Sequence, residues 1–340
     1  MNGSAPAGPA AAPIAVIGAG SWGTALAVQL ARGGRPVRLW GRDAAAMRGM
    51  ADARENRRYL PGVAFPLSLM PGAELDACLD GVTDILVAVP SDGFRETLQN
   101  IQPLLRDDAR ICWATKGIEL TTGKLPHQVV GELLGRERPM AVLSGPTFAA
   151  EVGKGLPTAL TIAANDDAFA NDLAEALSGA TFRAYTSTDI IGVEVGGAVK
   201  NVLAIGAGIS DGLGFGANTR VALINRGLAE MTRLGIALGA KQDTFTGLAG
   251  MGDLLLTCTD NLSRNRRMGL AIASGRTIEE AQAEIQQVVE GVPAAKAVHE
   301  VADRLEVEMP ICQQIYRILY EGVPPRAAVD TLMGRALKAE

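Results

Sequence analysis

The stretch "IAVIGAGSWGTALAVQLARGG", residues 14–34, decides the fold of the first half of this 340-residue chain. Four apolar residues predict a buried strand, and the apolar spacing that follows is typical of a helix ending at two glycines. Between the strand and the helix, Gly18, Gly20 and Gly23 form the spacing G-x-G-x-x-G. The question is which group must approach the backbone at this turn.

A dinucleotide answers that question. The first glycine permits a tight turn, the second lets a pyrophosphate approach the backbone, and the third lets the helix pack against the strand. The start of the helix then offers free N–H groups to the anion. Glycine-rich turns that only pack share the spacing, but the position between a strand and a helix favours binding of NAD or NADP.

Further along the chain, short apolar runs alternate with helical patterns as far as residue 187. This order predicts a Rossmann-type, doubly wound and mostly parallel sheet in an α/β domain. From residue 189 only helical patterns remain, which predicts an all-helical C-terminal domain. We therefore expect a disordered tail at 1–12, a dinucleotide-binding domain at 13–188 and a helical substrate-binding domain at 189–340. The expected strands are 14–18, 36–40, 84–90, 109–115, 140–145, 157–164 and 181–187.

Composition excludes several classes of protein. A net charge of −5 disfavours a general nucleic-acid binder, and the four scattered cysteines indicate reduced thiols in the cytoplasm without a metal site. We expect no signal peptide before the first strand, because no positive segment precedes an apolar core there. The apolar stretch 190–209 contains Glu194 and Lys200, which would be costly in lipid, so it is interpreted as a buried helix and not as an integral membrane segment.

The end of the second expected strand bears on the choice of nucleotide. NAD-selective sites often carry an acid there, and Asp43 could serve, but it also has the position of a helix N-cap before "AAAM". Arg42 is placed to meet a 2′-phosphate, or else is a solvated loop charge. We expect use of NADP, with NAD as the other possibility.

Ligands of an open α/β sheet bind at the carboxyl ends of the strands. Lys116 follows one such strand in "ATKGIE", and Gly145 and Thr147 follow the next in "SGPTFA". Lys116 would face the crevice with its charge, unless it simply points to water.

The helical half carries the chemistry candidates. Lys200 lies among small and apolar residues in "GGAVKNVLAIGAG", where an unpaired ammonium would be costly. It is therefore interpreted as an acid/base, with structural pairing as the alternative. Asp253 in "GMGDLLL" is either a helix N-cap or a carboxylate that orients Lys200 or a substrate hydroxyl. Neither His127 nor His299 is placed to act as a base.

A local basic cluster, "SRNRR", lies at the start of a predicted helix in this acidic chain. Ser263, Arg264 and Asn265 combine a hydroxyl, a guanidinium and an amide with a helix N-terminus, which favours an anion site. The alternative is a charged surface turn.

Taken together, "GAGSWGTALA", "VPS", "WATKG", "SGPTFA", "GGAVKNVLAIGAG", "GFGANTRVALINRGLAEM", "GMGDLLLTCT", "SRNRR" and "QVVEG" resemble the bacterial-type NAD(P)-dependent glycerol-3-phosphate dehydrogenases. The resemblance covers residues 14–335. It implies reversible reduction of dihydroxyacetone phosphate to sn-glycerol 3-phosphate, which supplies glycerophospholipid synthesis.

The resemblance also implies roles for single residues. Lys200 is implied as the proton acceptor in glycerol phosphate oxidation, with Lys116 and Asp253 beside it. The implied substrate-binding residues are Lys116, Gly145, Thr147, Lys200, Asp253, Ser263, Arg264 and Asn265. The implied cofactor-binding residues, besides the three glycines, are Ser21, Trp22, Arg42, Lys116, Ala149, Arg264, Val288 and Glu290.

Two other functions remain open at this point. One is a dehydrogenase of the same build that acts on another 2-hydroxyacid or a sugar, and the other is a nucleotide-binding sensor without catalysis. By analogy with folds of this build, a homodimer is expected.

Overall fold

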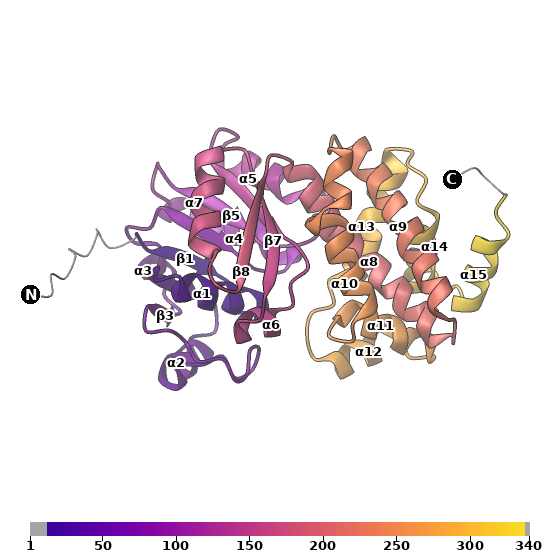
Figure 1. Cartoon of the computed structure of the whole chain (residues 1–340), viewed down its shortest axis with the longest axis horizontal. Coiled ribbons are helices and arrows are strands. Elements are labelled where there is room, and N and C mark those ends of the chain that lie inside the picture. The colour runs from indigo at the N-terminus through magenta and orange to yellow at the C-terminus, as the bar shows by residue number, and fades with distance from the viewer. Residues whose placement is uncertain (1–11, 337–340) are drawn as a thin grey trace, which may run out of the picture.

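The computed structural model describes residues 12–336, which contain one eight-stranded sheet followed by a bundle of helices (Figure 1). The predicted tail, 1–12, lies outside the described residues except for Ala12. Sheet order is β3-β2-β1-β4-β5-β6-β7-β8, and all pairs are parallel except β6 with β7. The strands are β1 (Ile14–Ile17), β2 (Val37–Trp40), β3 (Leu69–Gly72), β4 (Asp84–Val87), β5 (Arg110–Trp113), β6 (Met140–Ser144), β7 (Thr158–Ala164) and β8 (Phe182–Ser187).

The predicted mostly parallel sheet is thus confirmed, with one strand missed. Strand β3 pairs with β2 at the sheet edge, and Met70 within it is exposed. It contains Pro71 and ends at Gly72, residues that are depleted in strands and confined mainly to edges. Periodicity and composition therefore gave no sign of it.

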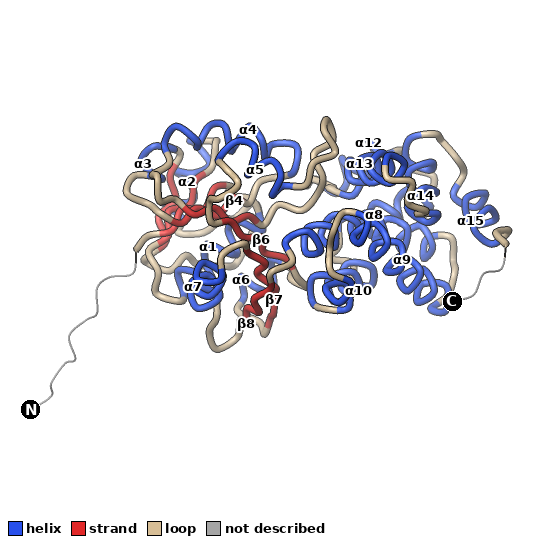
Figure 2. The backbone as a smooth tube through the Cα atoms, turned by 90° about the horizontal axis from the view of Figure 1, so that it is seen from above, coloured by secondary structure: helices blue, strands red, loops and turns tan. Residues whose placement is uncertain are grey.

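Helices cover both faces of the sheet. Figure 2 shows α3, α4 and α5 on one side and α1, α6 and α7 on the other. Successive side chains of β1 point to opposite faces of the sheet and so enter both cores. Ile14 and Val16 pack in the core under α1 and α7, whereas Ala15 and Ile17 pack in the core under α4 and α5. These helices are α1 (Ser21–Arg32), α2 (Ala44–Ala53), α3 (Leu75–Leu79), α4 (Phe94–Ile101), α5 (Pro126–Leu134), α6 (Ala149–Lys154) and α7 (Asp167–Leu177).

The helical half is built around α8 (Ile190–Gly212). This helix is long and apolar enough to span a bilayer, with a mean hydropathy of 1.5, yet 89% of its most apolar window is buried inside the protein. The prediction of a core helix is therefore confirmed. Around it pack α9 (Ala217–Ala237), α10 (Asp253–Thr259), α11 (Arg264–Ala273), α12 (Ile278–Ile285), α13 (Gly291–Arg304), α14 (Pro310–Tyr320) and α15 (Pro325–Met333).

Glycines let α8 and α11 touch backbone to backbone. A Cβ atom on Gly208 would lie 2.0 Å from the carbonyl oxygen of Arg266, and one on Gly269 would lie 2.0 Å from that of Ile205. Since real Cβ atoms do not approach so closely, only glycine fits at both positions. This contact fixes the start of α11, where the predicted anion site lies, against α8.

Candidate active site

The turn between β1 and α1 has the geometry of a dinucleotide site. Gly18 has φ +119°, and a Cβ there would lie 2.5 Å from the carbonyl oxygen of Ala88. A Cβ at Gly23 would lie 2.0 Å from the carbonyl oxygen of Gly18, so the helix can approach the strand only without a side chain. At Gly20 nothing lies within 4 Å of that position, which leaves the backbone open to a ligand.

The first turn of α1 is free to bind an anion. Its N-cap, Gly20, supplies no side-chain hydrogen bond, and no acidic residue follows in the first turn, which begins at Ser21. Trp22 packs against the core, and its buried Nε1 has no hydrogen-bond partner among the described residues. These residues therefore fit a pyrophosphate-bearing cofactor.

A residue missed by sequence reasoning holds this turn in place. Asn56 is fully buried, and its Nδ2 donates to the carbonyl oxygen of Ala19 at 3.0 Å and to Thr24 Oγ1 at 2.8 Å. It lies 37 residues from Ala19 in a loop, so no local pattern identifies it.

Arg42 and Asp43 follow β2, and the structure separates their roles. Asp43 is the N-cap of α2, with Oδ1 accepting from the backbone N–H groups of Ala45 and Ala46, both at 3.0 Å. Arg42 is exposed and makes no hydrogen bond or ion pair within residues 12–336. The N-cap interpretation of Asp43 is confirmed, and Arg42 is left as the free charge at this strand end.

The centre of the site is a buried carboxylate between two lysines. Asp253 is 1% exposed, and its Oδ2 accepts from Lys116 Nζ at 2.8 Å while its Oδ1 accepts from Lys200 Nζ. Lys116 follows β5, Lys200 lies in the middle of α8, and Asp253 opens α10. Two of the predicted alternatives are thereby excluded: Lys116 does not simply point to water, and the side chain of Asp253 does not cap its helix.

Burial and neighbouring charge set the protonation of this group. Burial lowers the pKa of Lys200, the positive charge of Lys116 lowers it further, and Asp253 opposes both, with a result of about 8. Burial alone would raise the pKa of Asp253, but the two lysines outweigh it and hold that pKa below its usual value. Lys200 is thus an ammonium that can lose its proton near neutral pH, as an acid/base requires.

Two neighbours complete this centre, and sequence reasoning missed both. Thr257, one turn after Asp253, accepts from Lys200 Nζ at 3.0 Å through Oγ1. Ser144, the last residue of β6, donates to Asp253 Oδ2 at 3.4 Å. The i, i+4 spacing of Asp253 and Thr257 was the one available signal.

The loop after β6 brings Gly145 and Thr147 to the same place. Thr147 Oγ1 donates to the carbonyl oxygen of Gly145 at 3.1 Å. Pro146 lies close to Gly252, since a Cβ on that glycine would be 3.5 Å from Pro146 Cγ. The loop therefore borders Asp253, and Ala149 then opens α6.

At the start of α11 the three predicted residues behave differently. Ser263 is the N-cap and accepts from the Arg266 N–H at 3.2 Å. Asn265 is buried, with Nδ2 donating to Asn201 Oδ1 at 2.8 Å and Oδ1 accepting from the Gly291 N–H at 2.9 Å. Arg264 has no hydrogen-bond partner within residues 12–336.

Asn265 is therefore part of the packing of α8, α11 and α13. Its partner Asn201 follows Lys200 directly, so the pair links α11 to α8. The two residues lie 64 positions apart, and sequence reasoning missed this link.

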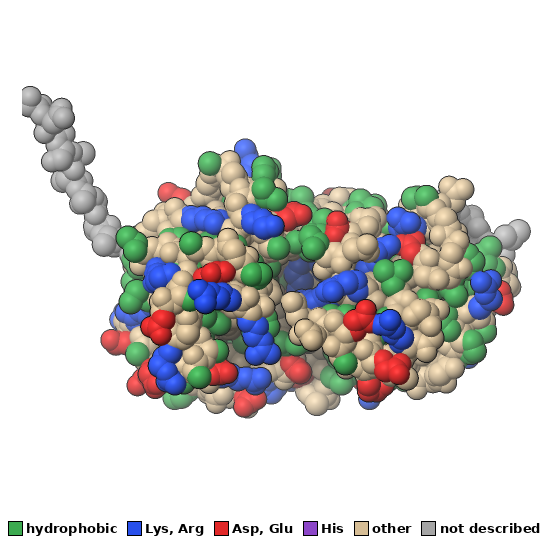
Figure 3. Space-filling view, turned by 90° about the horizontal axis from the view of Figure 1, so that it is seen from below, with side chains coloured by type: hydrophobic (Ala, Val, Ile, Leu, Met, Phe, Trp, Pro, Cys, Tyr) green, Lys and Arg blue, Asp and Glu red, His purple; other side chains and the backbone are tan. Residues whose placement is uncertain are grey.

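Glu290 faces this cluster, whereas Val288 is 51% exposed. Burial raises the pKa of Glu290 above its usual value, and the nearby charges of Arg264, Lys116 and Lys200 oppose that rise. Since Glu290 interacts with these three positive charges, the segment before α13 lies close to the Lys116–Asp253–Lys200 cluster. Figure 3 shows Lys and Arg side chains gathered beside and inside the recess between the two halves of the molecule. No cluster of metal-ligating side chains occurs in the described part of the chain.

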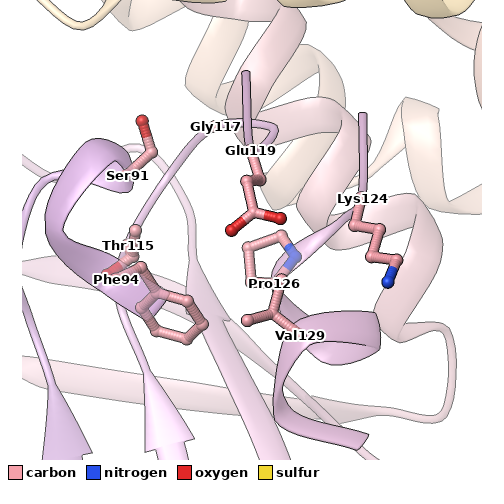
Figure 4. A pocket seen from close by; sticks show the side chains of 8 residues that line it. All are labelled: Ser91, Phe94, Thr115, Gly117, Glu119, Lys124, Pro126 and Val129. Atoms are coloured by element: carbon pink, nitrogen blue, oxygen red, sulfur yellow. The ribbon is translucent and has the colours of Figure 1, made fainter. Parts of the chain in front are cut away.

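A cavity behind Lys116 is a separate feature. Its volume is about 10 Å³, and Ser91, Phe94, Thr115, Gly117, Glu119, Lys124, Pro126 and Val129 line it (Figure 4). Small-molecule sites measure about 300–1,000 Å³. It is therefore no substrate pocket, but it shows where the Lys116 segment packs against the start of α5.

Comparison with known proteins agrees along nearly the whole chain. Residues 13–170 match the family described as NAD-dependent glycerol-3-phosphate dehydrogenase N-terminus, and residues 189–330 match the corresponding C-terminus. Relatives named glycerol-3-phosphate dehydrogenase (NAD(P)+) include one from Nitrosococcus oceani, 56% identical over 96% of this chain and 94% of its own length. Another, from Aliivibrio fischeri, is 55% identical over 96% of this chain and 95% of its own.

A solved structure shares the architecture. The crystal structure of a glycerol-3-phosphate dehydrogenase from Coxiella burnetii superposes with a TM-score of 0.93 at 50% identity, covering 96% of this chain and all of that one. The two chains therefore share the sheet and the helical bundle described above.

Proposed function

The chain belongs to the NAD-dependent glycerol-3-phosphate dehydrogenase family, and we propose that Lys200 is the acid/base of its reaction. It is an oxidoreductase that interconverts dihydroxyacetone phosphate and sn-glycerol 3-phosphate with NAD or NADP as cofactor. The observation that supports this role of Lys200 is the buried cluster of Lys116, Asp253 and Lys200. Reduction yields the backbone precursor of glycerophospholipids.

Lys200 donates a proton to the carbonyl oxygen as the alcohol forms, and in the reverse direction its free amine accepts that proton. The reduced nicotinamide, when bound, supplies the hydride to the carbonyl carbon. Asp253 holds the Lys200 ammonium in place through Oδ1. Lys116, on the other oxygen of Asp253, stabilises negative charge on the substrate oxygen.

Arg264 binds the substrate phosphate together with the start of α11, where Ser263 and Asn265 lie. A guanidinium without a partner in the described structure is suited to a bidentate bond with a phosphate. Gly145 and Thr147 complete the substrate site from the loop that borders Asp253.

Gly18, Gly20 and Gly23 would hold the pyrophosphate of the cofactor. Contacts from Ser21, Trp22, Ala149 and Lys116 on the sheet side, and from Arg264, Val288 and Glu290 on the helical side, complete its binding. Arg42 favours NADPH, because it is a free positive charge where a 2′-phosphate is expected, while the carboxylate of Asp43 caps α2.

The wider organisation follows from the same proposal. We propose a sheet domain at 13–188 and a helical domain at 189–340, a division supported by the end of β8 at Ser187 and the start of α8 at Ile190. The four free, buried cysteines accord with a cytoplasmic enzyme. We propose a homodimer with no nucleic-acid partner and no membrane-embedded part.

The test is oxidation of NADPH and of NADH with dihydroxyacetone phosphate, followed by absorbance. We expect turnover with both nucleotides, a lower KM for NADPH, and no turnover with dihydroxyacetone, which lacks the phosphate. Lys200→Ala should abolish turnover while nucleotide binding persists. Near-normal turnover in that variant would overturn the acid/base role, and cofactor binding without any turnover in the wild type would indicate a sensor instead.

A further inference from the structure

A second buried carboxylate lies outside the reacting cluster. Glu194 in α8 has a side chain 1% exposed. Its Oε1 accepts from the His127 N–H at 2.8 Å and from Trp113 Nε1 at 3.1 Å, and its Oε2 lies 2.5 Å from His127 Nδ1. Trp113 ends β5, and His127 lies in the first turn of α5. Glu194 therefore ties α8 to two elements of the sheet domain.

Side-chain hydrogen bonds between 12–187 and 190–336 are concentrated on few residues. Two buried carboxylates, Asp253 and Glu194, accept nearly all of them. The remainder come from the exposed Arg304, whose guanidinium lies 3.4 and 3.5 Å from the carbonyl oxygens of Thr122 and Gly123. Where the chain passes from one domain to the other, Lys241 Nζ also donates to Thr188 Oγ1 at 2.7 Å, an exposed contact. The two halves are thus joined by polar contacts at two buried points.

The two buried points are separated by a similar distance on each side of the contact between the domains. Glu194 precedes Lys200 by six residues on one continuous helix, a rise of about 9 Å. Trp113 precedes Lys116 by three residues at the end of a strand, at most about 10 Å of extended chain. A rigid helix attached at both points cannot tilt about either one.

The packing behind Lys116 extends this attachment. Pro126 and Val129 at the start of α5 share one small cavity with Thr115, Gly117 and Glu119 of the Lys116 segment (Figure 4). The start of α5, where His127 lies, is therefore a neighbour of the segment that carries Lys116.

Stability is not the only reason for a buried pair such as Glu194 and His127. A buried ion pair is often no better for stability than apolar residues of the same volume, so its use points to a role in fixing one conformation. We propose that Glu194 and His127 act as positioning residues, which set Lys116 against the Lys200–Asp253 pair although neither contacts substrate or cofactor. This inference rests on the proposed function of Lys200.

The mechanical consequence is specific. Lys200, Asp253 and Thr257 all belong to the helical domain, so they stay together if Glu194 is lost. Lys116 belongs to the other domain and would move away from them. A displacement of about 1 Å in a catalytic group can lower the rate about 100-fold. Retreat of the Lys116 charge would also raise the proton affinity of Lys200, because Lys116 is one of the groups that lower it.

The experiment compares Glu194→Gln, His127→Ala and the double variant of the full-length enzyme. We expect kcat for dihydroxyacetone phosphate reduction to fall about 10- to 100-fold. The double variant should be no worse than either single variant, since the two residues act as one unit. The alkaline limb of the kcat/KM profile should move to higher pH, which a loss of stability alone would not cause.

Two controls separate positioning from stability. Glu230→Gln removes another buried carboxylate, one that caps α14 within the helical domain, and Arg304→Ala removes the exposed cross-domain contact. Both should keep kcat and the pH profile of the wild type below their unfolding temperatures. If folded Glu194→Gln and His127→Ala are as active as the wild type, while Lys200→Ala is inactive, the positioning proposal is wrong and the proposed function stands. If Lys200→Ala is active, the proposed function itself is wrong.

Discussion

Removing the charge of Asp253 should shift the proton affinity of Lys200 in a known direction. Asp253→Asn keeps the shape of the side chain but leaves two ammonium groups facing each other, with side chains only 12% and 8% exposed. The repulsion between these ammonium groups exists in the wild type too, so the change comes from losing the attraction of the Asp253 carboxylate for Lys200. At an effective dielectric of about 20, opposite unit charges about 4 Å apart attract by about 4 kcal/mol. That energy corresponds to about three pKa units, of which we expect about two to remain after relaxation of the site.

The pKa of Lys200 would then fall from about 8 towards about 6. Reduction needs the ammonium form, so at pH 7.5 the competent fraction drops by about 25-fold and recovers as the pH is lowered. Lys116→Gln has the opposite sign, because the Lys116 charge lowers the pKa of Lys200 in the wild type. Its alkaline limb should move to higher pH.

The assay is kcat/KM for dihydroxyacetone phosphate across pH, since this parameter reports the free enzyme. The substrate phosphate titrates identically with every variant, so differences between profiles belong to the protein. Asp253→Asn should also lose about 3–5 kcal/mol of stability, because it leaves buried charge unpaired, and circular dichroism must first establish that it is folded. The account would be refuted if the alkaline limbs of Asp253→Asn and Lys116→Gln coincided with that of the wild type, or if both limbs moved in the same direction.

Three further outcomes are expected. Arg264→Ala should raise the KM for dihydroxyacetone phosphate about 10- to 100-fold through loss of a charged hydrogen bond, whereas the exposed Arg276→Ala should not change it. Gly269→Ala should lower the free energy of unfolding by about 3 kcal/mol or more, because its Cβ would meet a backbone carbonyl of α8, while Gly49→Ala, with open space around it, should raise that energy by about 0.5–1 kcal/mol in chemical denaturation. Burial raises the pKa of Glu230 from 4.5 to about 7. The stabilisation of the folded state by the protonated Glu230 is therefore complete below pH 4.5 and is lost as the pH rises towards 7. Over that range, the free energy of unfolding of the wild type relative to Glu230→Gln should decline by up to about 3 kcal/mol.

Features with local causes could be predicted from the sequence. The start of α12 has such a cause, because Thr277 and Glu280 form a capping box, with bonds of 3.2 and 2.9 Å. The turn at Gly18 and Gly23 was likewise predictable, since both glycines are required by contacts within one strand–turn–helix unit. Strand β3 was not, because Pro71 and Gly72 lack strand propensity and only pairing with β2 makes them a strand.

In the candidate active site, too, the local features could be predicted and the long-range contacts could not. Lys116, Lys200 and Asp253 could be selected singly, because each is a charged residue in an apolar or glycine-rich setting. Their contacts could not, since Lys116 and Asp253 lie 137 residues apart. Glu194 showed only as a charge inside an apolar run, and its pairing with His127 across 67 residues has no sequence signal. Pairings of this kind are decided by tertiary packing, which periodicity does not encode.

Small residues of α8 explain how a lysine comes to be buried where the two domains meet. A Cβ on Gly197 would lie 3.3 Å from Ser144 Oγ and 3.4 Å from Lys116 Cγ, and one on Gly196 would lie 2.4 Å from the carbonyl oxygen of Ala249. The helix therefore rests directly on the ends of β5 and β6. Lys200 follows one turn later, enclosed by protein instead of water, and this burial is the largest cause of its lowered pKa. The glycines thus contribute to the lowered proton affinity of Lys200, because a Cβ on Gly196 would meet a backbone carbonyl and force α8 away from the elements that bury this amine.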